Sequence, residues 1–194
     1  MVLPLSFYSR PTLEVLSDLI GMVLVHRSEQ GTTSGVIVEA EAYRGENDPA
    51  SFAFRGRTKK SEMLYGEPGK AFVYVCYGIH FLLNIVTEEK GFPAAVLIRA
   101  AEPLSGILLM KDRRRTQNLQ NLCSGPAKLC QAFAIDLSLN GVSLYSSRSP
   151  LLLKKGEKKG MELSWSPRIG IREGKERLWR ASLKNSPFVS VKSL

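Results

Sequence analysis

Two glutamates and a tyrosine alternate along one short stretch of the chain. Glu39, Glu41 and Tyr43 occupy alternate positions of residues 39–43, with small apolar residues between them. In a β-strand this spacing puts all three side chains on one face. A carboxylate beside an aromatic ring can act as a general base, but two glutamates on a strand face more often indicate a solvated surface. From these residues alone, the solvated surface is the simpler interpretation.

Polar residues inside apolar stretches are the next candidates. Asn84 lies within the apolar residues 81–86, so its amide is either a structural group with interior partners or a group that reads a ligand. Arg99 ends an apolar run, and an arginine in that position is expected to pair with a carboxylate. Tyr74 and Tyr77 are three positions apart, so a strand that held both would point them to opposite faces.

Metal and disulfide chemistry have little support in the sequence. The chain has two histidines, His26 and His80, and no Cys-x-x-Cys pair, so the ligand spacing of a zinc site is absent. The cysteines, Cys76, Cys123 and Cys130, are odd in number and have apolar or uncharged neighbours. We therefore expect reduced thiols in a cytosolic protein, and no metal or other cofactor.

Length and composition are those of one globular domain. The 194 residues are 44% hydrophobic and 23% charged, with 16 Gly and 10 Pro, which excludes collagen-like, low-complexity and largely disordered chains. The chain has no run of 18 apolar residues, and its first residues lack the basic start and apolar core of a secretory signal. We therefore expect no membrane span, and a single domain over residues 1–194.

Positive charge is concentrated in the second half of the chain. Residues 1–97 hold 9 Lys and Arg against 11 Asp and Glu, whereas residues 98–194 hold 18 against 7. Basic clusters occur at residues 55–60, 111–115, 154–159 and 172–180. This pattern favours a polyanionic partner over a merely solvated surface. It favours nucleic acid over an anionic membrane, since no amphipathic basic helix is evident.

The elements that must position these residues follow from hydrophobic periodicity and from turn residues. Helices are predicted at residues 11–21, at 104–113 and from Pro126 onward, the last with Ser124 as its cap. Strands are predicted at residues 22–27, 35–43, 72–77, 81–87 and 94–99. The aromatic residues of the long polar segment 44–70 favour docking over disorder. We predict an α+β fold, a single compact domain with a mixed, mainly antiparallel sheet and flanking helices.

Five segments in a consistent order carry a family resemblance. They are VEAEAY at 38–43, RGRT at 55–58, YVCYGIHFLLN at 74–84, VLIRAAEP at 96–103 and CSGPAKLCQA at 123–132. Together they resemble the 3-methyladenine (alkyladenine) DNA glycosylase family. Shorter matches at residues 168–171 and 186–190 extend the resemblance over about residues 7–192.

The resemblance implies roles for several of these residues. Glu41 matches the general base that activates the water attacking C1′ of the damaged nucleotide, and we expect Glu39 to matter far less. Arg99 and the backbone carbonyl of Ile169 match the other groups that hold this water. Tyr43 and Tyr74 match the aromatic walls between which a flipped base stacks. Tyr77 matches the side chain inserted into the duplex, and Asn84 the amide that excludes bases with a 2-amino group. The further base-binding positions it implies are Ala42, Phe52 and Leu97, and the phosphate-contacting positions are Arg57 and Lys60.

One position departs from the family pattern. Phe52 stands where the family usually carries a histidine that hydrogen-bonds the edge of the base. Phe52 in place of this histidine would change the range of substrates, whereas the residues that activate the water are all present.

The resemblance therefore implies a monofunctional DNA glycosylase of base excision repair. It would act as a monomer on double-stranded DNA containing a damaged purine and leave an abasic site. It would be cytoplasmic, at the nucleoid of a bacterium, or nuclear in a eukaryote. One alternative is a non-catalytic binding protein for damaged DNA, which has no need of Glu41 with Arg99. Another is a hydrolase of small glycosides using Glu39 and Glu41, which has no use for so basic a second half.

Overall fold

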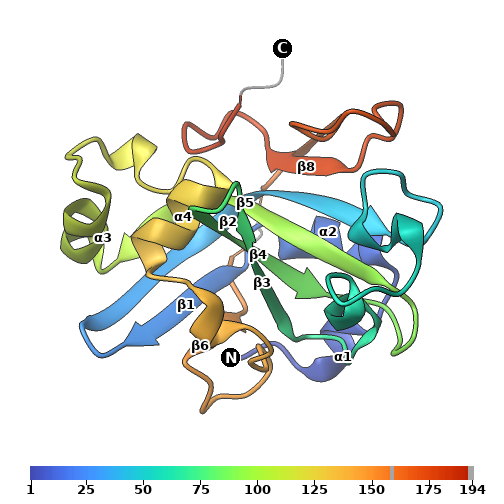
Figure 1. The fold of residues 1–194 in the computed structure, drawn as a ribbon. Helices are drawn as coiled ribbons and strands as arrows, with labels where there is room; N and C mark the ends of the chain where they lie inside the picture. The colour runs from blue at the N-terminus through green and yellow to red at the C-terminus, as the bar shows by residue number, and fades with distance from the viewer. Residues whose placement is uncertain (158–159, 192–194) are drawn as a thin grey trace.

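A curved antiparallel sheet forms the centre of the protein (Figure 1). The structure, a computed structural model, describes residues 1–157 and 160–191. Its strands are β1 (Val23–Ser28), β2 (Gly31–Arg44), β3 (Ala71–Cys76), β4 (His80–Val86), β5 (Ala94–Ser105), β6 (Leu151–Lys154), β7 (Leu163–Ser166) and β8 (Arg180–Leu183). The strand order is β3-β4-β5-β2-β1-β6, and β8 joins β2 and carries β7. Each pairing among the described strands is antiparallel. This confirms the α+β class, with a sheet that is antiparallel where a mixed one was predicted.

Short helices pack around this sheet. The α-helices are α1 (Leu5–Tyr8), α2 (Thr12–Leu19), α3 (Ile107–Arg114) and α4 (Pro126–Phe133). The 3-10 turns are η1 (Phe52–Arg55), η2 (Glu62–Tyr65), η3 (Leu119–Asn121) and η4 (Leu137–Leu139). Helix α2 confirms the predicted helix at 11–21, and it buries Val15, Leu16 and Leu19 in the core. None of the helices in the described residues is long and apolar enough to span a bilayer.

Several predicted boundaries differ from those of the structure. The strand predicted from residue 35 begins at Gly31, and two other differences have local reasons. The sequence pattern started a helix at residue 104, but β5 continues to Ser105, which pairs with Ser34. Gly106 then separates strand from helix with a φ of 71°, and a Cβ on it would lie 2.4 Å from the carbonyl oxygen of Thr32. Ser124 was predicted to cap α4, but the cap position is Gly125, without a side-chain hydrogen bond.

The second half of β2 is paired along both of its edges. Glu39, Ala40 and Glu41 pair with β5 on one side and with β8 on the other. The register against β5 shifts between Ile37 and Ala40, so β2 is bulged there. A strand paired on both sides exposes neither of its edges. This part of β2 is therefore an interior strand of the sheet, and the side chains of Glu39 and Glu41 are buried as well.

A second, smaller apolar cluster fixes the long segment 44–70. Turn η1 contributes Ala53, and η2 contributes Leu64 and Tyr65. They pack against Phe72, Val86 and Ala95 of the sheet. The prediction that this segment is docked is confirmed.

Candidate active site

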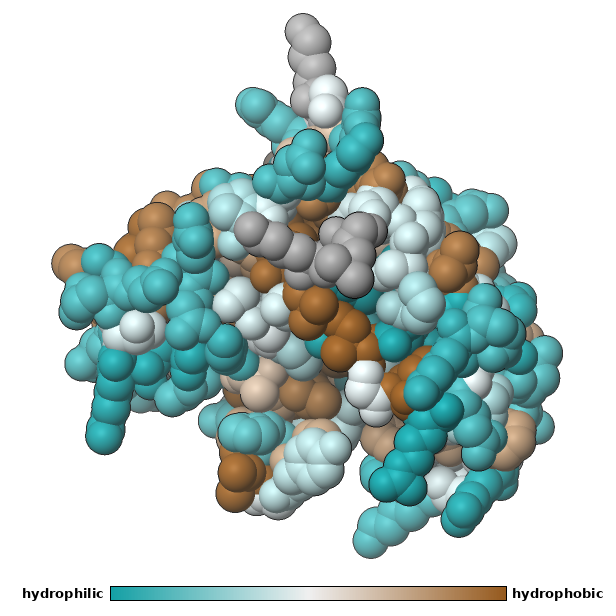
Figure 2. Space-filling view, turned by 90° about the horizontal axis from the view of Figure 1, so that it is seen from above, coloured by the Kyte–Doolittle hydropathy of each residue, from teal (hydrophilic) through white to brown (hydrophobic). Residues whose placement is uncertain are grey.

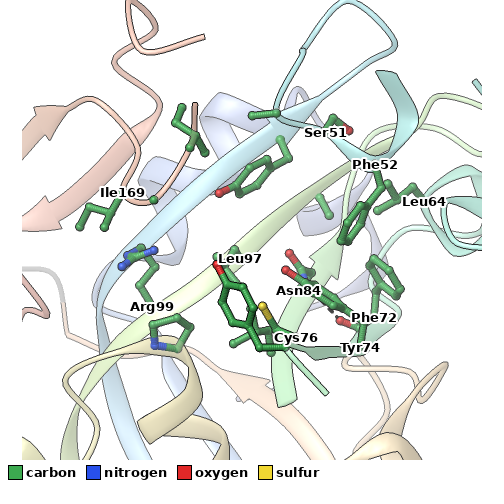
Figure 3. Close-up of a pocket in the computed structure, with 18 residues that line it drawn as sticks. Ser51, Phe52, Leu64, Phe72, Tyr74, Cys76, Asn84, Leu97, Arg99 and Ile169 are labelled. Carbon is green, nitrogen blue, oxygen red and sulfur yellow. Dashed lines mark hydrogen bonds between the residues drawn. The ribbon is translucent and has the colours of Figure 1, made fainter. Parts of the chain in front are cut away.

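A cavity of about 260 Å³ opens beside β2, β3, β4 and β5. The rings of Phe52, Phe72 and Tyr74 lie at one end of it, and Arg99 and Ile169 lie at the other (Figure 3). Further lining residues are Tyr43, Leu64, Cys76, Tyr77, Asn84, Leu97 and Pro126. This volume is just below the roughly 300–1,000 Å³ usual for sites of drug-sized ligands. Its size and aromatic walls suit one flat ring system.

Glu41 lies directly behind this cavity and is held by three groups that line it. The carboxylate has 0% exposure and is not itself part of the lining. Its Oε1 accepts a hydrogen bond from the backbone N–H of Ile169 at 2.7 Å. Its Oε2 accepts from the Tyr43 hydroxyl at 2.9 Å and from Arg99 Nη1 at 3.2 Å. The contact from Ile169 is made by the amide N–H, whereas the resemblance implied a role for its carbonyl.

The electrostatic setting of Glu41 is that of a base. Burial raises the pKa of this carboxyl above its usual range, and it outweighs the opposing effects of Arg99, the Ile169 amide and the Tyr43 hydroxyl. Nearby Glu39 acts in the same direction as burial. A raised pKa makes the ionised carboxylate a stronger proton acceptor.

The solvated strand face that Glu39 and Glu41 suggested is not what the structure shows. Both glutamates are fully buried. Arg99 pairs with each of them, through Nε to Glu39 Oε1 at 2.8 Å and through Nη1 to Glu41 Oε2. The expected pairing of Arg99 with a carboxylate is confirmed. The interpretation failed because the residues that cover this face come from β8 and the C-terminal segment, far away in the sequence.

A buried ion pair supports Tyr43 from behind. Arg168 makes two hydrogen bonds to Asp48, at 2.6 and 2.7 Å, and both side chains are buried. The guanidinium lies 4.7 Å from the centre of the Tyr43 ring and donates to the carbonyl of Ala42. Ala42 itself does not line the cavity, and its side chain is part of the main core.

The opposite wall is a cluster of edge-to-face rings. The centroids of Phe52 and Tyr74 are 4.8 Å apart with an interplanar angle of 84°. Lys60 covers Phe52 from outside, with its Nζ 4.1 Å from the ring centre. Asn84 is buried beside them and donates from Nδ2 to the carbonyl of Phe72 at 3.3 Å. One amide hydrogen and the amide oxygen remain for a ligand.

The mouth of the cavity carries the most exposed tyrosine of the site. Tyr77 is 91% exposed and lies in the turn between β3 and β4, where its φ is 52°. It does not continue the strand of Tyr74, so the predicted opposite-face geometry is replaced by a projecting hairpin tip. The next side chain, Ile79, is 74% exposed. An aromatic ring held away from the protein on a tight turn can enter another molecule.

The face above the cavity combines apolar and charged surface. Figure 2 shows apolar side chains in its middle with hydrophilic ones on both sides. Arg57 makes a two-pronged, exposed ion pair with Glu62, at 2.7 and 2.9 Å. Such exposed pairs contribute little stability, so a phosphate can compete for the arginine.

Not all predicted basic clusters are free for a polyanion. In residues 111–115, Arg113 donates to the carbonyl of Ala132, and Arg114 donates to that of Leu122. These contacts tie α3 to its surroundings, so part of this cluster is structural. The cluster at 154–159 extends to two residues outside the described part of the chain.

Comparison with known proteins bears directly on this geometry. Residues 6–187 match the model of the family described as methylpurine-DNA glycosylase (MPG). The chain belongs to this family. A protein of Carboxydothermus hydrogenoformans is 46% identical over 193 residues, which cover 99% of this chain and 100% of that protein. Proteins of Prosthecochloris aestuarii (96% of this chain, 90% of that protein) and Methanocella arvoryzae (99% and 97%) are each 44% identical. All three carry the provisional name 3-methyladenine DNA glycosylase.

Membership in the methylpurine-DNA glycosylase family confirms the resemblance found in the sequence and places the chain among the enzymes of DNA repair.

Sequence reasoning missed four residues that build the site of this family member: Asp48, Arg168, Arg180 and Ser190. Arg168 and Ser190 lie in short segments that matched the family, which was the one signal for them. Asp48 stands in a polar stretch that gave none, and Arg180 was counted in the basic cluster at 172–180, whereas the structure buries it against Glu39.

Proposed function

We propose that the protein is a monofunctional DNA glycosylase that flips a damaged purine into the aromatic cavity and hydrolyses its N-glycosidic bond. Water activated by Glu41 attacks C1′, and the products are a free base and an abasic site. The observation that carries this proposal is the buried Glu41, fixed by Arg99, Tyr43 and Ile169 at the back of an aromatic cavity.

The Glu41 carboxylate keeps an unused lone pair that can accept from one further donor. A carboxylate oxygen has two lone pairs, and Oε1 of Glu41 accepts one hydrogen bond, from Ile169. A water that donates to Oε1 of Glu41 from the side of Arg99 and Ile169 would lie between this carboxylate and the cavity. Glycosidic cleavage develops positive charge on the sugar, which a neighbouring carboxylate stabilises.

Base recognition follows from the walls. Stacking between Tyr43 and Tyr74 favours a cationic, alkylated ring by about 0.5–2 kcal/mol over a neutral one. Alkylation also makes the purine a better leaving group. The amide hydrogen left on Asn84 would oppose the 2-amino group of guanine, since both are donors.

Extrusion of the base costs a few kcal/mol, and less for a damaged pair. Tyr77 at the hairpin tip would fill the space left in the stack. The basic loops, with Arg57 and Lys60, would hold the phosphates. These contacts require duplex DNA.

The decisive variant is Glu41→Gln. It keeps the size of the side chain and removes the base, so we expect single-turnover excision of a methylated purine to fall by roughly 10²–10⁴ while binding of lesion DNA persists. Glu88→Gln is the control, because Glu88 is a partly buried, ion-paired carboxylate outside the cavity. Binding of lesion DNA by the wild-type protein without release of any base would favour the non-catalytic alternative.

The same assay examines whether the strand is cut. Among the cavity-lining residues in the described part of the chain there is no lysine to form a Schiff base. We expect an intact strand that breaks only after alkali treatment. A covalent adduct trapped by borohydride would contradict simple hydrolysis.

A further inference from the structure

Glu39 is a fully buried carboxylate that does not line the cavity. It accepts hydrogen bonds from Arg99 Nε and Arg180 Nε, each at 2.8 Å. It also accepts from the backbone N–H of Ser190 at 2.5 Å and from the Ser190 hydroxyl at 2.8 Å. Among these partners Arg99 alone lines the cavity, whereas all three partners of Glu41 line it, so Glu39 does not reach a ligand there. Any influence it has on a reaction there must pass through its partners.

Arg99 is the partner that does reach the cavity. Its guanidinium divides its three nitrogens between Glu39 Oε1, Glu41 Oε2 at 3.2 Å and Ser190 Oγ at 3.4 Å. Because the guanidinium is planar and rigid, these three directions fix its rotation as well as its position. Loss of Glu39 would leave Glu41 as the one carboxylate that orients it, and loss of the Ser190 hydroxyl would remove the contact of its third nitrogen.

The C-terminal segment reaches this network from the far end of the chain. It follows β8, which lies across the top of the sheet in Figure 1. Ser190 touches both Glu39 and Arg99, and Arg180 Nη2 donates to the carbonyl of Val191. The network thus joins β2, β5 and β8 to the last described residues.

Charge within the network is balanced. The buried residues Glu39 and Glu41 face Arg99 and Arg180, two carboxylates against two guanidiniums. Removal of one partner from a buried set leaves a charge without compensation, and the remaining groups rearrange toward each other. Without the charge of Glu39, the guanidinium of Arg99 would turn toward Glu41.

We propose that Glu39 and Ser190 are positioning residues that hold Arg99 in its catalytic orientation beside Glu41, so that the C-terminal segment is a working part of the active site. The inference rests on the proposed function, because it assigns these residues to the same reaction. A positioning role for Glu39 differs from a merely structural one because it changes the titration of Glu41.

That effect has a defined sign. The titratable and charged groups that face Glu41 are Glu39 and Tyr43 from β2, Arg99 from β5, Tyr74 from β3 and, across the strand pair, Arg180 from β8. After burial, Arg99 is the strongest influence on the pKa of Glu41 and lowers it, whereas Glu39 raises it. In Glu39→Gln the raising charge is gone and Arg99 acts on Glu41 alone. The pKa of Glu41 then falls, and with it the strength of the base.

The experiment compares Ser190→Ala and Glu39→Gln with two matched controls. Ser186→Ala removes another buried hydroxyl of the same segment, and Glu88→Gln removes another ion-paired carboxylate. Single-turnover excision from a duplex with one methylated purine is measured from pH 5 to pH 9. Binding of the same duplex and thermal unfolding are measured in parallel.

We expect Ser190→Ala to lower the plateau rate about tenfold, which corresponds to about 1.4 kcal/mol, with lesion binding within about twofold of wild type. We expect Glu39→Gln to lower it further, but by far less than Glu41→Gln does, and to shift the acid limb of the profile to lower pH. Rates for Ser190→Ala equal to those for Ser186→Ala would overturn the proposal, whether or not Glu39→Gln folds. So would a Glu39→Gln profile with an unmoved acid limb in a folded protein.

Failure of the proposed function would look different. In that case the wild-type protein would excise nothing, or Glu41→Gln would match it. An active wild type, an inactive Glu41→Gln and fully active Glu39→Gln and Ser190→Ala would refute only the role of the C-terminal segment.

Discussion

Tyr43 has two roles in the site, and one substitution separates them. Its ring forms a wall of the cavity, and its hydroxyl donates to Glu41. Tyr43→Phe keeps the wall and removes a hydrogen bond that lowers the pKa of Glu41. That pKa should rise further above its usual range. Because the base must be ionised to work, the acid limb of the pH–rate profile should move to higher pH, opposite to the shift expected for Glu39→Gln.

A plateau rate within about threefold of wild type would show that stacking is intact. Tyr65→Phe is the matched control, because Tyr65 also donates to a glutamate, Glu46, but does not line the cavity. A Tyr43→Phe profile that coincides with this control would argue against Glu41 as the titrating base.

Phe52 is the second residue with a specific consequence. It lines the cavity and offers a ring edge but no hydrogen bond. A hydrogen bond to the base edge contributes about 0.5–1.5 kcal/mol net, which is roughly two- to tenfold in rate. We expect Phe52→His to improve excision of the neutral lesion ethenoadenine relative to cationic methylated purines, which stacking and charge already favour.

The measurement for Phe52 is the ratio of the two excision rates under one set of conditions. Phe52→Leu serves as the comparison that loses the ring without adding a hydrogen-bonding group. A ratio that is the same in Phe52→His and wild type would mean that residue 52 does not face the base.

The β3–β4 hairpin projects from the protein and carries Tyr77 at its tip. Tyr77→Ala should weaken binding to lesion DNA by about tenfold, since a base–aromatic stack contributes roughly 1–3 kcal/mol. Binding to undamaged DNA should change little, because no base has left the stack there. Tyr77→Phe, which keeps the ring, should behave like wild type. Equal losses on both DNAs, measured by fluorescence anisotropy, would reassign Tyr77 to general DNA contact.

Local patterns were sufficient for the elements that are local. Helix α2 and the strands β1, β2, β3 and β4 follow from periodicity and turn residues, and the structure confirms them to within a few residues at their ends. The pairing of β8 with Glu39–Glu41 does not follow from any such pattern, because it joins distant segments. The residues of the candidate site likewise fall into those that local motifs predict and those that depend on distant segments. Motifs pointed to Glu41 and Arg99, whereas the burial of Glu39 depends on residues about 150 positions away.

The excess of positive charge on the whole molecule should make the affinity for DNA depend on salt concentration. Each phosphate contact contributes about 0.9 to the slope of log affinity against log salt concentration. Lys60→Ala should lower this slope by about one and weaken lesion and undamaged DNA equally. Lys90→Ala is the matched control, because its exposed side chain lies after β4, at the opposite end of that strand from the Tyr77 hairpin. Equal slopes for the two variants would remove Lys60 from the DNA interface.

The double pairing of β2 also bears on the order of folding. Ile169 and Ser190 reach Glu41 and Glu39 across 128 and 151 positions of the chain, and contacts of such separation form late. During synthesis the sheet from β1 to β5 emerges first, with its two glutamates still open to water. The network around Glu41 and Glu39 is completed only after residues 169 and 190 have left the ribosome, so a nascent or truncated chain carries the aromatic wall of the cavity without the chemistry.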